Sequence, residues 1–182
     1  MAYFRRCTGS HAGGQVTTMD GQVHDIPAWD LMIAHPPCTY LSNVGAPHMR
    51  VKGQIVPERY DKAMEAKRFF LRFLDAEIPR IAVENPTPLK LVGLPPYTQA
   101  IQPYEYGHPY SKRTCLWLKN LSKLEPTDVV EPICSWVSGC KMKTDGSKRN
   151  SEVPPFRDPK IRSKSFPGIA RAMAEQWGGL AK

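Results

Sequence analysis

The chain has 182 residues, of which 41% are hydrophobic and 23% charged, a composition typical of a globular protein with one buried core. Its net charge of +8 favours a polyanionic partner, nucleic acid before others. No stretch approaches the roughly 18 apolar residues of a membrane span, and no apolar signal core stands near the N-terminus. The sequence therefore excludes a membrane protein and predicts a cytoplasmic one.

The cysteines give no sign of a metal site or a disulfide scaffold. They number five, an odd count, and no two form a CxxC pair. Cys134 and Cys140 are the closest pair, and no histidine stands near them. We therefore expect neither a disulfide framework nor a zinc site, and we assign no metal.

Residues 1–28 are rich in glycine, threonine and histidine and show little periodicity, so they predict an irregular segment. The apolar run from Leu31 to Ala34 predicts a short buried strand that ends at two prolines and Cys38. Cys38 by itself is open to two interpretations. A cysteine is often a small buried hydrophobic residue, and it is also a nucleophile.

The following segment predicts a strand–helix–strand unit. Residues 57–76 have Pro57 in the first turn and one broad apolar face, which predicts a helix. Residues 78–83 predict a second strand, residues 113–118 a third, and residues from Pro167 a closing helix that stops at Gly178. Two strands joined by a long helix favour a parallel sheet with helices on its faces, which is an α/β fold.

Polar groups follow the first two predicted strands directly. Pro37-Cys38 comes after the first strand, and Glu84-Asn85-Pro86 comes after the second. Ligands of α/β sheets bind at the carboxyl ends of strands. If the two strands are neighbours, a thiol and a carboxylate meet at the same edge of the sheet.

The positive charge is concentrated between Lys141 and Lys164, within a loop that we place at about residues 120–164. The stretch from Lys141 to Lys164 holds eight lysines and arginines against three acidic residues, and few large apolar ones. It is interpreted either as a solvated loop or as an arm that contacts phosphates, and both can hold at once.

Three blocks of the sequence occur in the order found in the cytosine-5 DNA methyltransferases. Pro37-Cys38 resembles the catalytic Pro-Cys of that family, and Glu84-Asn85-Pro86 resembles its Glu-Asn-Val. The stretch 106–118 resembles Gly-x-Pro-Gln-x-Arg-x-Arg running into a strand. Gly107 and Pro109 match this block. Tyr110 stands at the Gln position, Lys112 at the first Arg position and Thr114 at the second. Arg113 falls between the two Arg positions. The resemblance covers roughly residues 22–178 and is to a small, phage-borne branch of the family.

The resemblance implies a Rossmann-like methyltransferase fold with a mostly parallel sheet, S-adenosylmethionine as cofactor and DNA as partner. Cys38 would be the thiolate that adds to carbon 6 of cytosine, Glu84 would hold ring nitrogen 3, and Arg113 would be a cation that favours the thiolate. The base must be flipped out or already unpaired. The enzymes that methylate amino groups carry an aromatic residue where Cys38 stands, so the resemblance favours chemistry at the ring carbon. The remaining candidates are Asp25, Pro36 and Pro37 for the cofactor, and Asn85, Lys112, Lys148, Arg149, Arg162 and Lys164 for the base or the DNA.

The family opens with a strand and a Phe-x-Gly-x-Gly turn that seats the cofactor, and only 28 residues precede Trp29 here. We therefore expect an N-terminally shortened fold, with an irregular segment at 1–28 and one methyltransferase-like domain at 29–182. Two alternatives stay open. One is a catalytically inactive nucleic-acid-binding module, and the other is one subunit of a split methyltransferase whose second chain supplies the missing cofactor half. The resemblance implies a bacterial or phage-infected host cell as the setting.

Overall fold

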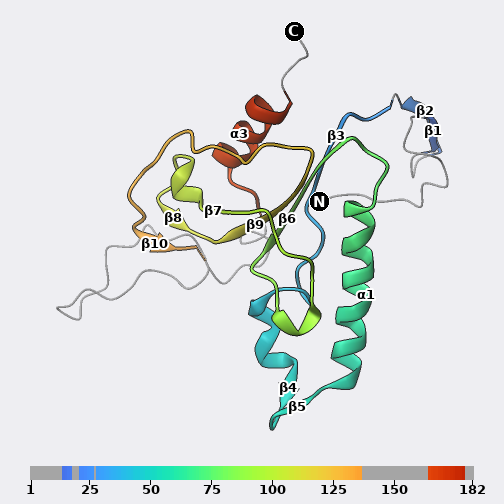
Figure 1. Ribbon diagram of the computed structural model, residues 1–182, viewed down its shortest axis with the longest axis vertical. Coiled ribbons are helices and arrows are strands. Elements are labelled where there is room, and N and C mark those ends of the chain that lie inside the picture. The colour runs from blue at the N-terminus through green and yellow to red at the C-terminus, as the bar shows by residue number, and fades with distance from the viewer. Residues whose placement is uncertain (1–13, 18–20, 27, 137–163, 179–182) are drawn as a thin grey trace. The chain divides into compact units, whose positions relative to one another are not determined.

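The computed structural model describes residues 14–17, 21–26, 28–136 and 164–178 (Figure 1). Its elements, in chain order, are β1 (Gly14–Thr17), β2 (Val23–Ile26), β3 (Leu31–Ala34), η1 (Asn43–His48), β4 (Arg50–Val51), β5 (Gln54–Ile55), α1 (Pro57–Leu74), β6 (Arg80–Pro86), η2 (Lys90–Val92), β7 (Gln99–Ile101), η3 (Pro103–Glu105), β8 (Tyr110–Ser111), β9 (Thr114–Lys119), β10 (Cys134–Ser135) and α3 (Pro167–Trp177), where η marks a 3₁₀ helix.

The chain groups into two compact units. The first comprises Met1–Gln99 and Cys115–Ser122, and the second comprises Ala100–Thr114 and Lys123–Lys182. The single domain that the sequence predicts over 29–182 therefore contains parts of both units.

The N-terminal segment contains a β-hairpin that the sequence does not predict. Strands β1 and β2 pair antiparallel, with Gly14 opposite Ile26 and Gln15 opposite Asp25. The expectation of an irregular segment over 1–28 is wrong for these two strands. Each strand is only four residues long, which is too short for an alternating pattern to stand out in the sequence.

The predicted strand–helix–strand unit is confirmed in the first unit. Strands β3 and β6 pair in parallel, in a register that joins Leu31 to Arg80 and Ala34 to Val83, and Figure 1 shows them side by side. Strand β6 begins later than predicted and continues through Glu84, Asn85 and Pro86. Those residues lie past the last pair with β3 but still within the strand.

Helix α1 covers this part of the sheet with aromatic side chains. Pro57 occupies its first turn, and it ends at Leu74 with Asp75 as the C-cap. Phe70 is fully buried and meets Trp117 of β9 edge to face, with 5.0 Å between the ring centroids. Phe73 is also buried. The helix therefore anchors the crossover that connects β3 to β6.

The main sheet has the strand order β3-β6-β9-β7 and is mixed. Strand β9 begins one residue after its predicted start, at Thr114, and its residues Cys115, Leu116 and Trp117 are buried. The chain is thus an α/β protein, as the sequence predicts. The finer expectation, a mostly parallel sheet of the Rossmann-like kind, stays a prediction, and the parallel pairing of β3 with β6 agrees with it.

The second unit is built around α3, the predicted closing helix, which spans Pro167–Trp177 with Gly178 as its C-cap. Its apolar face buries Ile169, Ala172, Met173 and Trp177. At its first turn, the backbone N–H of Gly168 donates to Nε2 of His108 at 2.9 Å. A Cβ atom at Gly168 would collide with the carbonyl oxygen of Tyr106, so the close approach requires glycine.

No helix within the described ranges combines the length and the apolar character that crossing a membrane requires.

Cys38 and Cys115 are reduced, whereas Cys134 is disulfide-bonded. The sequence led us to expect no disulfide framework, and it does not predict the bond at Cys134, because spacing along the sequence does not report which thiols meet in space.

Candidate functional site

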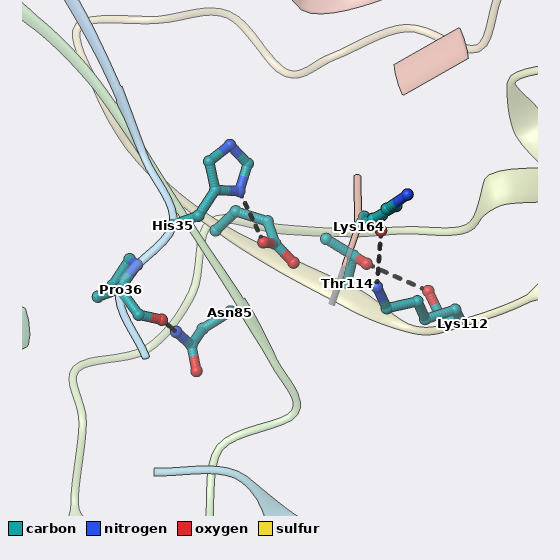
Figure 2. Close-up of polar contacts among 7 residues, drawn as sticks. His35, Pro36, Asn85, Lys112, Thr114 and Lys164 are labelled. Carbon is teal, nitrogen blue, oxygen red and sulfur yellow. Dashed lines mark hydrogen bonds and ion pairs between the residues drawn. The ribbon is translucent and has the colours of Figure 1, made fainter. Parts of the chain in front are cut away.

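The parallel register of β3 and β6 brings the residues that follow their last pair together. Nδ1 of His35 lies 2.9 Å from Oε2 of Glu84, although the two residues are 49 positions apart (Figure 2). The Glu84 side chain is 19% exposed and the His35 side chain 41%. The pair thus has an inner carboxylate and an outer imidazole that solvent can reach.

Asn85 links the same two strand ends through the backbone. Its Nδ2 donates to the carbonyl oxygen of Pro36 at 2.9 Å, as Figure 2 shows, and its exposed fraction is only 1%. Because successive side chains alternate across a strand, Glu84 and Asn85 serve different sides of β6. Oδ1 of Asn85 has no hydrogen-bond partner within the described ranges. Asn85 therefore holds the chain just before Cys38, at the cost of one buried, unsatisfied oxygen.

The turn at Cys38 is fixed by backbone hydrogen bonds. The carbonyl oxygen of Cys38 accepts from the N–H groups of Leu41 and Ser42, both at 3.0 Å. The backbone of residues 41–43 then bonds to the backbone of residues 87–89, through Leu89 N–H to Leu41 O at 2.7 Å and Asn43 N–H to Thr87 O at 3.0 Å. The loops that follow β3 and β6 therefore lie side by side.

Packing against α1 supports the same turn. The guanidinium of Arg59 lies over the ring of Tyr40, 5.1 Å from its centroid. A Cβ atom at Gly45 would lie 2.8 Å from the carbonyl oxygen of Thr39, which leaves room for glycine alone. The segment after Cys38 is thus held by both the sheet and the helix.

Cys38 itself is half-buried, and its thiol is reduced. The structure brings together Pro36, Asn85, Glu84 and the backbone of Cys38 at one edge of β3 and β6. That the Cys38 thiol and the Glu84 carboxylate share one pocket stays a prediction. A nucleophile in the loop after one strand and a carboxylate near the end of the neighbouring strand are the groups that an addition to an electron-poor ring requires.

The predicted cations lie in the second unit. Arg113 is exposed, and Nζ of Lys112 donates to the carbonyl oxygen of Lys164 at 3.5 Å, while Thr114 Oγ1 donates to the carbonyl oxygen of Lys112 at 3.2 Å (Figure 2). Nζ of Lys112 also lies 5.7 Å from the centroid of the Phe166 ring. The role of Arg113 beside the thiol stays a prediction. Of the four basic-loop candidates, Lys164 is exposed, and Lys148, Arg149 and Arg162 lie outside the described residues.

The three cofactor candidates differ in accessibility. Asp25 is exposed on β2, and Pro37 is exposed between Pro36 and Cys38. Pro36 is buried, and its carbonyl oxygen is already bonded to Asn85. Asp25 and Pro37 are open to a ligand, whereas Pro36 fits a supporting role. No group of three or more His, Cys, Asp or Glu side chains in the described part of the chain is arranged to hold a metal ion.

Sequence reasoning gave no role to three residues of this region: His35, Tyr40 and Arg59. His35 directly follows β3 and stands three positions before Cys38 in the sequence, so its position at the strand end was a signal that the sequence already contained. Arg59 and Tyr40 are 19 positions apart, and no local pattern links them.

The fold and the site together define an α/β protein with a reduced cysteine, a carboxylate–imidazole pair and a buried amide at adjoining strand ends. Comparison of the chain with protein-family models, curated proteins and solved structures finds no significant match. A proposal about its function therefore depends on the site and on the motif resemblance.

Proposed function

We propose that this chain is a DNA cytosine-5 methyltransferase of a small, phage-type branch, built on a shortened Rossmann-like methyltransferase fold. One observation carries the proposal. Cys38 lies in the loop after β3, Glu84-Asn85-Pro86 end the neighbouring parallel strand β6, and backbone hydrogen bonds join residues 41–43 to residues 87–89. Motifs that the family separates in sequence therefore adjoin here.

The chemistry assigns each group a role. Carbon 5 of cytosine is a poor nucleophile, and addition of the Cys38 thiolate to carbon 6 makes carbon 5 able to attack an electrophilic methyl group. Glu84 holds ring nitrogen 3 as charge develops there. Asn85, through Pro36, keeps the backbone before the nucleophile in place.

S-adenosylmethionine supplies the electrophilic methyl group when it is bound. Asp25, as an exposed carboxylate, fits a hydrogen-bond acceptor for the adenosine part, and exposed Pro37 fits a contact surface beside the nucleophile. Pro36 supports the site through the bond between its carbonyl oxygen and Asn85, and we assign it no direct contact with the cofactor. A second chain that provides further cofactor contacts is compatible with this assignment.

DNA is the proposed partner, with cytosine in an unpaired or flipped state. The net charge of +8 supports binding to phosphates, and Lys148, Arg149, Arg162 and Lys164 are the proposed contacts. The proposed setting is the cytoplasm of a bacterial or phage-infected cell.

Covalent trapping tests the proposal. DNA that carries 5-fluorocytosine should form a stable adduct with the wild-type protein in the presence of S-adenosylmethionine, because fluorine cannot leave as a cation in the final elimination. Cys38→Ser should form none, because its hydroxyl is far less acidic than a thiol. Cys115→Ala, which changes the other reduced cysteine of the described residues, should still form the adduct.

Calorimetry with S-adenosylmethionine separates the alternatives. Adduct formation and cofactor binding by the purified chain support the complete enzyme. DNA binding with neither adduct nor cofactor binding would instead identify a non-catalytic nucleic-acid-binding module. Adduct formation that requires a second chain would identify a split enzyme.

A further inference from the structure

The contact between His35 and Glu84 places a proton donor at the carboxylate that faces the base in the proposed reaction. The 2.9 Å separation between Nδ1 and Oε2 is a hydrogen-bond distance. Oε1 of Glu84 has no hydrogen-bond partner within the described ranges, so it is available to a ligand. The 41% exposure of the His35 side chain lets its ring exchange protons with solvent.

The proposed reaction needs a proton where a carboxyl group ordinarily has none. Ring nitrogen 3 of cytosine is a hydrogen-bond acceptor, so a group that stabilises charge there must donate. Carboxyl groups are ordinarily ionised at neutral pH and accept only. A proton therefore has to reach Glu84 from a neighbour, and a histidine is the side chain best suited to exchange one near neutral pH.

We propose that His35 is a positioning residue that supplies Glu84 with the proton it donates to ring nitrogen 3, and that the pair thereby selects cytosine over uracil. This inference rests on the proposed function. As the Cys38 thiolate forms its bond to carbon 6, the π electrons of the carbon 5–carbon 6 bond shift toward carbon 4 and nitrogen 3. Nitrogen 3 takes the proton that Glu84 carries on Oε1. Oε2 takes the Nδ1 proton of His35 as solvent delivers a proton to Nε2 of the exposed ring, so that Glu84 is again a carboxylic acid and the imidazole ends neutral.

The selectivity follows from donor and acceptor patterns. A protonated Glu84 donates to nitrogen 3 of cytosine, but it would face the N–H donor that uracil carries at the same position. An ionised Glu84 would have the opposite preference. A site built to hydrogen-bond one pattern strongly rejects the other, because mismatched polar groups are left unpaired.

Adduct formation on two matched substrates tests the proposal. Single-stranded DNA with either 5-fluorocytosine or 5-fluorouracil at one position is mixed with cofactor and with wild type, His35→Ala or His35→Asn. His35→Ala should slow adduct formation on 5-fluorocytosine by about 100-fold, the usual size of a general-acid contribution. The cytosine-to-uracil rate ratio should fall by at least about 10-fold.

His35→Asn separates proton supply from geometry, because its amide nitrogen can donate a hydrogen bond to Glu84 but cannot transfer a proton. Relative to His35→Ala, we expect His35→Asn to recover the affinity for 5-fluorocytosine DNA, measured without cofactor. It should not recover the rate of adduct formation. His48→Ala, which changes another exposed histidine, should match wild type.

The outcomes are distinguishable. Wild-type trapping together with an unchanged rate ratio in His35→Ala would overturn the inference and leave the proposed function standing. Full recovery of the rate in His35→Asn would overturn proton supply. Absence of any adduct with the wild type would overturn the proposed function and this inference with it.

Discussion

Asn85 shows at the scale of one residue that a site can be built at the expense of stability. Its side chain is 1% exposed, its Nδ2 bonds to Pro36, and its Oδ1 has no partner among the residues that the structure describes. A buried polar atom without a hydrogen bond destabilises the fold. The amide is kept there because its donor holds the backbone that leads to Cys38.

Replacing Asn85 by alanine should lower the free energy of unfolding by about 1–3 kcal/mol, since the buried carbonyl of Pro36 loses its donor. The unfolding free energy from urea denaturation measures the change. Asn43→Ala is the matched control, because Asn43 is exposed, and it should stay within about 0.5 kcal/mol of wild type. Equal stability of Asn85→Ala and wild type would contradict the structural role of the amide.

At the scale of elements, the start of α3 depends on a side chain 60 positions away. His108 accepts the N–H of Gly168 through Nε2, so the imidazole is neutral in this contact. Burial lowers the pKa of His108, against a smaller opposite effect of the Asp128 charge. The first turn of α3 is therefore held by a hydrogen bond to His108, whose imidazole favours the unprotonated state in the folded protein.

The lowered pKa of His108 predicts acid sensitivity. Above the unfolded pKa of 6.5, both states are neutral and the contribution to stability is complete. As the pH falls below that value, the unfolded chain binds the proton first, so the free energy of unfolding decreases until the lower folded pKa is passed. Urea denaturation at several pH values between about 5 and 7.5 measures this decrease.

His108→Gln is the control for that experiment, because its side-chain oxygen can accept the Gly168 N–H and does not titrate. Its stability should depend less on pH than that of wild type over the same range. If the two pH profiles have the same slope, His108 is not the group responsible.

In the first unit, we expect a larger loss of stability when a buried ring of helix α1 is removed. Phe70→Ala removes a fully buried ring that meets Trp117, and it should lower the free energy of unfolding by about 3–5 kcal/mol. Thermal or urea unfolding measures it. Arg72→Ala, on an exposed position of the same helix, should change stability little. Similar values for the two variants would mean that α1 is not docked through Phe70.

At the scale of the whole molecule, charge is the property that bears on function. The chain carries 25 lysines and arginines against 17 acidic residues, and eight of the basic residues fall between Lys141 and Lys164. Such a distribution favours binding to phosphates through long-range attraction and release of counterions. The strength of this binding should therefore depend on salt.

Replacing Lys148, Arg149, Arg162 and Lys164 by glutamine should weaken DNA binding at every sequence. On duplex DNA, the slope of log affinity against log salt should become shallower by about 0.9 for each phosphate whose charge the protein no longer neutralises. Fluorescence anisotropy over a salt series measures it. The control changes four other exposed cations, Lys52, Lys90, Lys123 and Arg171, which alters the net charge equally. The same slope in both variants would assign the basic segment to solvation alone.

The sequence by itself determined the elements that local patterns encode. Periodicity, prolines and the closing glycine predict β3, α1 and α3 nearly to the residue, and the strand–helix–strand order predicts the α/β class. It also singled out Cys38 and Glu84 as candidates, because both stand at the ends of predicted strands. These features depend on neighbours within a few positions, which is the range over which a sequence pattern acts.

Only the tertiary structure decided which distant groups meet. The bond between His35 and Glu84 and the bond between Asn85 and Pro36 each join residues 49 positions apart. Both follow from the register that sets Ala34 against Val83. A shift of one residue in that register would turn every side chain of the strand to the other face. Pairing geometry across the sheet, which no local pattern encodes, therefore made a histidine the partner of the candidate catalytic carboxylate.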